Sequence, residues 1–79
     1  MVIKVDAFQS KYLRDLPLHP SQKETKHNEE YSIFEYRLKP EFDFEQEIFS
    51  NMDTMEVVEP QWLREDIRER LQRMMEKYK

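Results

Sequence analysis

The sequence predicts an α+β protein, a ferredoxin-like βαββαβ sandwich with an additional C-terminal helix. Runs of β-branched and aromatic residues alternate with runs of apolar residues at helical spacing, in the order strand, helix, strand, strand, helix, strand, helix. Pro17, Pro40 and Pro60 mark points where these runs end or begin. A split βαβ order of this kind predicts a four-stranded antiparallel sheet with helices on one face.

The first strand and helix are predicted at residues 1–6 and 7–16. Ile3 and Val5 are β-formers that share one face of the strand. The apolar residues of the helix recur at helical spacing, and Pro17 ends it. This spacing predicts an apolar face made of Phe8, Tyr12, Leu13 and Leu16.

A hairpin is predicted next, from strands at residues 23–27 and 31–38 joined by a turn at Asn28. The first strand is polar and rich in lysine, as suits the edge of a sheet. In the second strand, alternation places two sets of side chains on opposite faces. One set is Phe34, Tyr36 and Leu38, and the other begins with Tyr31 and Ile33.

The last part of the chain predicts a short helix to Ser50 with Asp43 as its N-cap, a strand at 54–58, and a long helix with Pro60 at its first position. The long helix carries one apolar stripe, and three acid–base pairs at i,i+3 or i,i+4 lie away from it. We expect the rest of the chain to cover this whole stripe, which is Leu63, Ile67, Leu71, Met74 and Tyr78.

Length and composition predict one domain over residues 1–79. Because the first strand begins directly at Met1, we expect this domain to be a piece of a longer protein. The chain has no cysteine and no long apolar run, so we expect a cytoplasmic protein without a membrane segment. The net charge is −4 and the middle of the chain is acidic. Such a surface repels a phosphate backbone, so we do not expect this chain alone to bind DNA.

Catalysis and metal binding find little support in the residues. The two histidines, His19 and His27, lack the spacing of metal ligands, and no serine lies in a nucleophile motif. Carboxylates are plentiful, but so short a chain offers little volume for a pocket that would separate their pKa values. We therefore expect no enzyme activity, no metal and no cofactor.

Two surfaces are candidates for function. One is an interface made by an apolar side of the sheet and an exposed tryptophan. The alternatives are that a helix covers this side of the sheet, and that the tryptophan packs on the sheet edge as part of the core. Its members are Ile3, Tyr31, Ile33 and Trp62. The other is an anion or ligand contact, with ion pairing within the long helix as its alternative. Its members are His19, Gln22, Arg64 and Arg68.

Four stretches resemble the C-terminal extension of bacterial WYL-domain transcriptional regulators. They are the runs at 16–23, 31–40 and 47–50 and, above all, Met55-Glu56-Val57-Val58-Glu59-Pro60-Gln61-Trp62-Leu63-Arg64. The resemblance implies a ferredoxin-like domain that follows a winged helix-turn-helix domain and a WYL barrel in the same protein. It also implies a homodimer, a role in regulation, and DNA binding only through the full-length protein. The alternative function is a domain that senses a small ligand, either a nucleotide or a metabolite.

Overall fold

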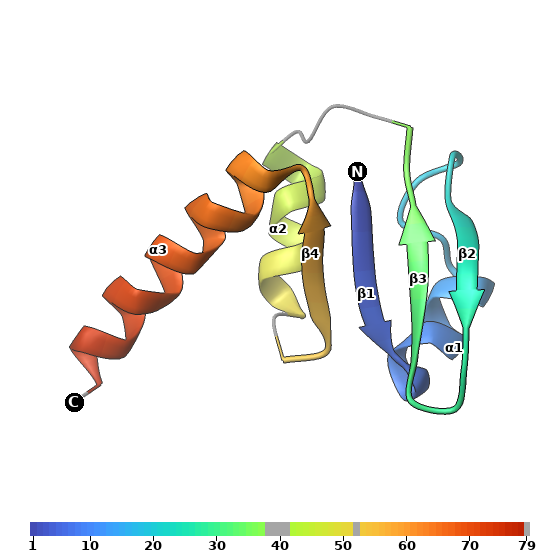
Figure 1. The fold of residues 1–79 in the computed structure, drawn as a ribbon, viewed down its shortest axis with the longest axis horizontal. Coiled ribbons are helices and arrows are strands. Elements are labelled where there is room, and N and C mark those ends of the chain that lie inside the picture. Colours follow the sequence, from blue (N-terminus) through green and yellow to red (C-terminus); the bar gives the residue numbers. More distant parts are fainter. Residues whose placement is uncertain (38–41, 52, 79) are drawn as a thin grey trace.

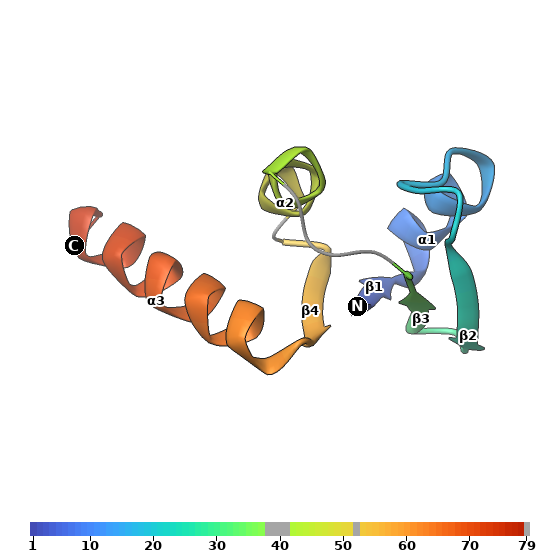
Figure 2. The same cartoon turned by 90° about the horizontal axis from the view of Figure 1, so that it is seen from above.

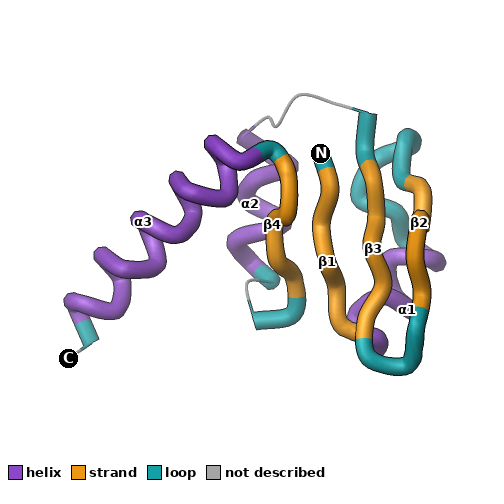
Figure 3. The backbone as a smooth tube through the Cα atoms, viewed as in Figure 1, coloured by secondary structure: helices purple, strands orange, loops and turns teal. Residues whose placement is uncertain are grey.

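The computed structural model describes residues 1–37, 42–51 and 53–78. Helices and strands follow one another in the predicted order (Figure 1), and Figure 3 shows the same path coloured by element. The elements are β1 (Val2–Asp6), α1 (Ala7–Asp15), β2 (Lys23–His27), β3 (Tyr31–Glu35), α2 (Phe42–Ser50), β4 (Met55–Glu59) and α3 (Gln61–Lys77).

The strands form one four-stranded antiparallel sheet in the order β2-β3-β1-β4. The first strand therefore lies inside the sheet, and β2 and β4 are its two edges. Ile3 stands opposite Phe34 of β3 on one side and Val57 of β4 on the other. The predicted α+β class with an antiparallel sheet is confirmed.

The helices are unequally placed around this sheet. Figure 2 shows α1 and α2 on the same face of the sheet, and α3 beside the β4 edge, running away from the strands. The other face carries no helix in the described part of the chain. A small domain with one covered sheet face has a small core, and the polar residues of the strands are expected on the open face.

The core is the layer between the sheet and the helices. Alternation along β1 sends Ile3 and Val5 into it, and Phe34 does the same from β3. The helices contribute the apolar side chains that meet them. The buried apolar residues are Ile3, Val5, Leu13, Phe34, Tyr36, Ile48, Met55, Val57, Leu63 and Ile67.

Tyr36 is the largest fully buried side chain of this core, and it brings a hydroxyl group with it. That hydroxyl donates to the Gln22 side-chain oxygen over 2.6 Å. Burial raises the pKa of the Tyr36 phenol above its ordinary value. The Gln22 amide in turn donates to the Leu13 carbonyl at 2.8 Å, so this side chain links Tyr36, the residue after β3, to α1.

Helix α1 turns a different face to the sheet from the one predicted. Asp6 is its N-cap, with a side-chain oxygen that accepts from the Gln9 N–H over 2.7 Å. The residues that face inward are Ser10 and Leu13, and the Ser10 hydroxyl donates to the Asp6 carbonyl over 2.7 Å. Because a small side chain sits at the contact, the helix lies close to the strands and its larger residues point outward. The predicted apolar face is therefore wrong for Phe8, Tyr12 and Leu16, which are exposed.

The β2–β3 hairpin confirms the polar strand at Lys23–His27. Its turn is held by Asn28, whose side-chain oxygen accepts from the Glu30 and Tyr31 N–H groups, each over 2.8 Å. An asparagine that bonds its own turn in this way replaces glycine, which the chain lacks. Among the described residues, none has a positive φ.

Some predicted boundaries differ from those observed. The strand at 31–38 is shorter, and Leu38 lies outside the described residues, although Tyr36 keeps its predicted face and is buried. Helix α2 is described from Phe42, and the side chain of Asp43, its predicted N-cap, lies outside the described part of the chain. Pro60 is the N-cap of α3 rather than its first helical residue, because the helix starts at Gln61.

Candidate functional site

The first half of α3 is anchored to the sheet. Leu63 is fully buried and Ile67 is 8% exposed. Beside them, Arg64 reaches back to β4, where one guanidinium nitrogen donates to the Glu56 carboxylate at 2.6 Å and to the Val57 carbonyl at 2.9 Å. The Val57 carbonyl lies on the outer edge of an edge strand, so Arg64 supplies a partner that no further strand provides.

The second half of α3 is not covered by the described part of the chain. A helix of 17 residues is about 25 Å long, and α3 runs past the β4 edge (Figure 1). The prediction that the rest of the chain covers the whole apolar stripe is therefore wrong beyond Ile67. The exposed apolar side chains, with their exposed fractions, are Leu71 (39%), Met74 (55%), Met75 (69%) and Tyr78 (87%).

An open groove of about 620 Å³ lies between β4 and α3. Met55 and Val57 line it from the strand, and Ile67, Leu71 and Met75 line it from the helix. The apolar lining therefore continues from the buried half of α3 to its exposed half. We call the four exposed apolar side chains together with this groove the α3 surface.

Ion pairing on α3 is sparser than predicted. The Asp66–Arg70 pair forms, with 3.3 Å between Arg70 Nε and the carboxylate. The predicted pairs Glu65–Arg68 and Glu69–Arg73 do not form among the described residues. Arg70 also lies over the Phe49 ring of α2, 5.0 Å from its centroid. Arg68 lines the groove, and its charge is available to a group that binds there.

The open face of the sheet carries an aromatic ring with two ammonium groups. The Lys4 nitrogen is 4.4 Å and the Lys26 nitrogen 5.4 Å from the centroid of the Tyr31 ring. A hydrogen bond to Lys26 and the positive charges of both lysines lower the pKa of the Tyr31 phenol below its ordinary value. The prediction of a mainly apolar sheet face missed this arrangement, because Lys4 and Lys26 lie on different strands and meet only at the Tyr31 ring of the strand between them.

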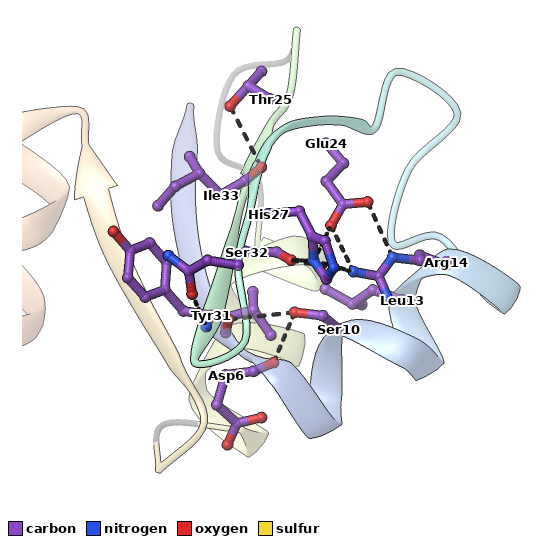
Figure 4. Close-up of polar contacts among 12 residues, drawn as sticks. Asp6, Ser10, Leu13, Arg14, Glu24, Thr25, His27, Tyr31, Ser32 and Ile33 are labelled. Carbon is purple, nitrogen blue, oxygen red and sulfur yellow. Dashed lines mark hydrogen bonds and ion pairs between the residues drawn. The ribbon is translucent and has the colours of Figure 1, made fainter.

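A polar network joins α1 to the hairpin on the covered face (Figure 4). Arg14 binds Glu24 in a bidentate manner, over 3.0 and 2.7 Å, and it also donates to Ser32 at 3.2 Å. One Arg14 nitrogen is 2.9 Å from His27 Nδ1, which is the acceptor because a guanidinium can only donate. The hydrogen bonds from Arg14 lower the pKa of Glu24 to about 2.

The network is structural in character, because every charged group in it has a partner within the same cluster. The network was not predicted, since its four residues on α1, β2 and β3 become neighbours only when α1 packs against the hairpin. The sequence signal was a carboxylate and a histidine, Glu24 and His27, on the predicted edge strand.

The four candidate interface residues do not form one surface. Ile3 is fully buried in the core, so its assignment to the exposed side of the sheet is corrected. Tyr31 and Ile33 lie on the opposite, open face and are half-buried. Trp62 is 59% exposed and lies at the start of α3, beside the β4 edge.

The four candidate anion contacts are also divided between two places. His19 and Gln22 lie in the connection between α1 and β2, where His19 Nδ1 is 2.7 Å from the Ser21 hydroxyl and Gln22 bonds Tyr36. Arg64 and Arg68 lie on α3, at the opposite edge of the sheet (Figure 1). The fold does not bring the two pairs together.

Within the described residues, no group of three or more histidine, aspartate or glutamate side chains is arranged to hold a metal ion. None of the helices in that part of the chain has the length and apolar character needed to span a lipid bilayer. The described part of the chain is a small α+β domain whose most distinctive features are the α3 surface and the open face of the sheet.

The sequence matches the family model of the WCX domain over residues 1–75. The chain belongs to this family, which is the C-terminal extension domain of WYL-domain regulators. The resemblance noted in the sequence is thereby confirmed, and the chain is a regulatory accessory domain of that class of transcriptional regulator. No curated protein and no solved structure matches the chain.

Proposed function

We propose that this domain serves its regulator as a dimerisation module, and that the α3 surface makes the contact. The observation that carries the proposal is the row of four apolar side chains on the second half of α3, exposed by 39 to 87%. Monomeric proteins seldom leave a continuous apolar strip of this kind uncovered beside a groove. A second copy of the chain offers both a matching strip and a matching groove.

The spacing of the stripe suits an antiparallel pairing of two α3 helices. A two-fold axis near Leu71 sets this residue against Leu71 of the partner subunit. The same axis sets Met75 against Ile67 of the partner subunit, which lines the groove. It also brings Tyr78 toward Arg64 of the partner subunit, where an aromatic ring and a guanidinium attract each other.

The size of this contact predicts a weak dimer. Stable interfaces bury about 800 Å² per subunit, whereas the facing halves of two helices bury only a few hundred. We expect a dissociation constant on the order of 10 to 100 µM for this chain alone. In the full-length protein, contacts of the WYL barrel and the winged helix-turn-helix domain would add to it.

Several finer properties belong to the same proposal. The domain is non-catalytic, cytoplasmic, and bound to DNA only through the other domains of its regulator. Its architecture is the ferredoxin-like sandwich with an extra helix. The strand order β2-β3-β1-β4, with α1 and α2 on one face, supports that description.

Cysteine cross-linking tests the proposed pairing, because the chain has no cysteine of its own. The variant Leu71→Cys places one thiol next to the two-fold axis, and we expect it to form a disulfide-linked dimer under mild oxidation. Leu16→Cys is the matched control, since that leucine is also exposed, by 77%, but lies after α1. Equal dimer formation by both variants, or by neither, would contradict the proposed contact.

A further inference from the structure

The open sheet face holds two ammonium groups around one aromatic ring. Lys4 on β1 and Lys26 on β2 both stand opposite Ile33 of the strand between them. From these positions both side chains reach the Tyr31 ring, at 4.4 and 5.4 Å from its centroid. The ring attracts each ammonium group and so holds two like charges close together despite their mutual repulsion.

The acidic side chains of this face leave both lysines without an ion pair in the described part of the chain. Glu56, which stands opposite Lys4, binds Arg64 at 2.6 Å. Glu35 stands opposite a different lysine, Lys23. Asp6, which stands opposite Tyr31, accepts from the Gln9 N–H. Among the described residues, neither ammonium group at Tyr31 forms an ion pair with a carboxylate.

We propose that Lys4, Lys26 and the Tyr31 hydroxyl form a binding site for the phosphate group of a small ligand. A dianionic phosphate has enough oxygens to accept hydrogen bonds from both ammonium groups and the hydroxyl together. The ligand is a small molecule rather than a nucleic acid strand, because a domain of net charge −4 repels a long phosphate backbone. Recognition is of the phosphate and not of a base, because the ammonium groups lie over the ring on which a base would stack.

This site shares no residue with the α3 surface, so the phosphate-binding proposal can be tested independently of the proposed dimer. It gives a chemical class, a phosphorylated small molecule, to the alternative that the domain senses a ligand. It also lies on a face that no helix covers in the described part of the chain, so a ligand reaches it without any rearrangement of the fold.

The test is an NMR titration of the isotope-labelled chain with inorganic phosphate, at constant ionic strength set with chloride. We expect saturable shifts at the amides of Lys4, Lys26 and Tyr31, and none at Ser10 on the covered face. Ribose 5-phosphate and adenosine monophosphate form two further arms, and we expect affinities within about threefold of each other. The absence of saturable shifts would overturn the site, and a tenfold preference for the adenosine compound would overturn recognition through phosphate alone.

Charge variants separate a specific site from general attraction. We expect the double variant K4Q/K26Q to bind phosphate at least tenfold more weakly. The matched control K11Q/K77Q removes two exposed lysines from α1 and α3, and we expect its affinity to stay within twofold. Equal losses in the two double variants would overturn the proposal. The single variant Tyr31→Leu removes the ring that gathers the lysines, so we expect weaker binding here too, and an unchanged affinity would remove Tyr31 from the site.

Discussion

Truncation of two leucines on α3 should separate the anchored half of the helix from the free half. Leu63 is fully buried, so Leu63→Ala removes its packing and leaves a cavity, at a cost of about 2–5 kcal/mol. Leu71 is 39% exposed and borders only an open groove, so Leu71→Ala should cost less than about 1 kcal/mol in the monomer. A domain of 79 residues has a total stability of roughly 4–12 kcal/mol, so the first change removes a large share of it.

Urea unfolding followed by circular dichroism measures this difference. With a slope near 1 kcal/mol per molar, we expect Leu63→Ala to lower the midpoint by about 2 M or more, and Leu71→Ala by less than about 1 M. The experiment is run at a few micromolar, where the proposed dimer is dissociated. At several hundred micromolar, Leu71→Ala should cost more than it does in dilute solution. Equal losses for the two variants in dilute solution would refute the division of α3 into two halves.

Two further predictions concern polar groups. The pKa of Glu24 is lowered to about 2 in the folded chain, so its contribution to stability is complete above the ordinary carboxylate pKa and is lost as pH falls toward 2. A double-mutant cycle between Glu24→Gln and Arg14→Gln, measured by urea unfolding, should give a coupling free energy of about 1 kcal/mol at pH 7 and almost none at pH 2. A coupling free energy unchanged at pH 2 would contradict an ion pair between Glu24 and Arg14. Replacing the N-cap of α1 by Asp6→Ala should lower the free energy of unfolding by about 1 kcal/mol, as measured by thermal unfolding. Asp6→Asn should lower it little, because an amide oxygen can still accept from the Gln9 N–H. Equal losses in the two variants would mean that the cap does not stabilise the helix.

The order of the elements was predictable from the sequence because each carries its own local signal. Alternation identifies β1 and β3, and Pro17 and Pro60 mark the limits of α1 and α3. Even β2, whose composition is poor for a strand, followed from its position between a loop and a turn at Asn28. The class of regulator was also accessible, through the motifs around the last strand.

The faces of the elements were harder to predict, since they depend on register and rotation. Ile3 was assigned to the exposed side of the sheet, but its pairing with Phe34 places it in the core, and a shift of one residue would have reversed this. In α1 the apolar residues outnumber the places available in a thin core. The helix therefore packs through Ser10 and Leu13, although the larger apolar side chains predicted a different face.

The candidate functional surfaces depend on tertiary neighbours, which a single sequence does not reveal. Lys4 and Lys26 meet at Tyr31 only because β3 lies between their strands. The free half of α3 was misjudged for a different reason. The spacing of its apolar residues is the same whether this chain or another chain covers them. The length of the helix relative to the sheet shows that its second half extends beyond the strands, and the sequence does not reveal this.

Sedimentation velocity of the chain, from a few micromolar to near one millimolar, tests the role of the α3 surface most directly. We predict a reversible monomer–dimer equilibrium that the double variant L71S/M75S abolishes. The control F8S/L16S, which changes two exposed apolar residues at α1, should leave it unchanged. A chain that stays monomeric over this whole range, or a dimer that survives L71S/M75S, would contradict the account.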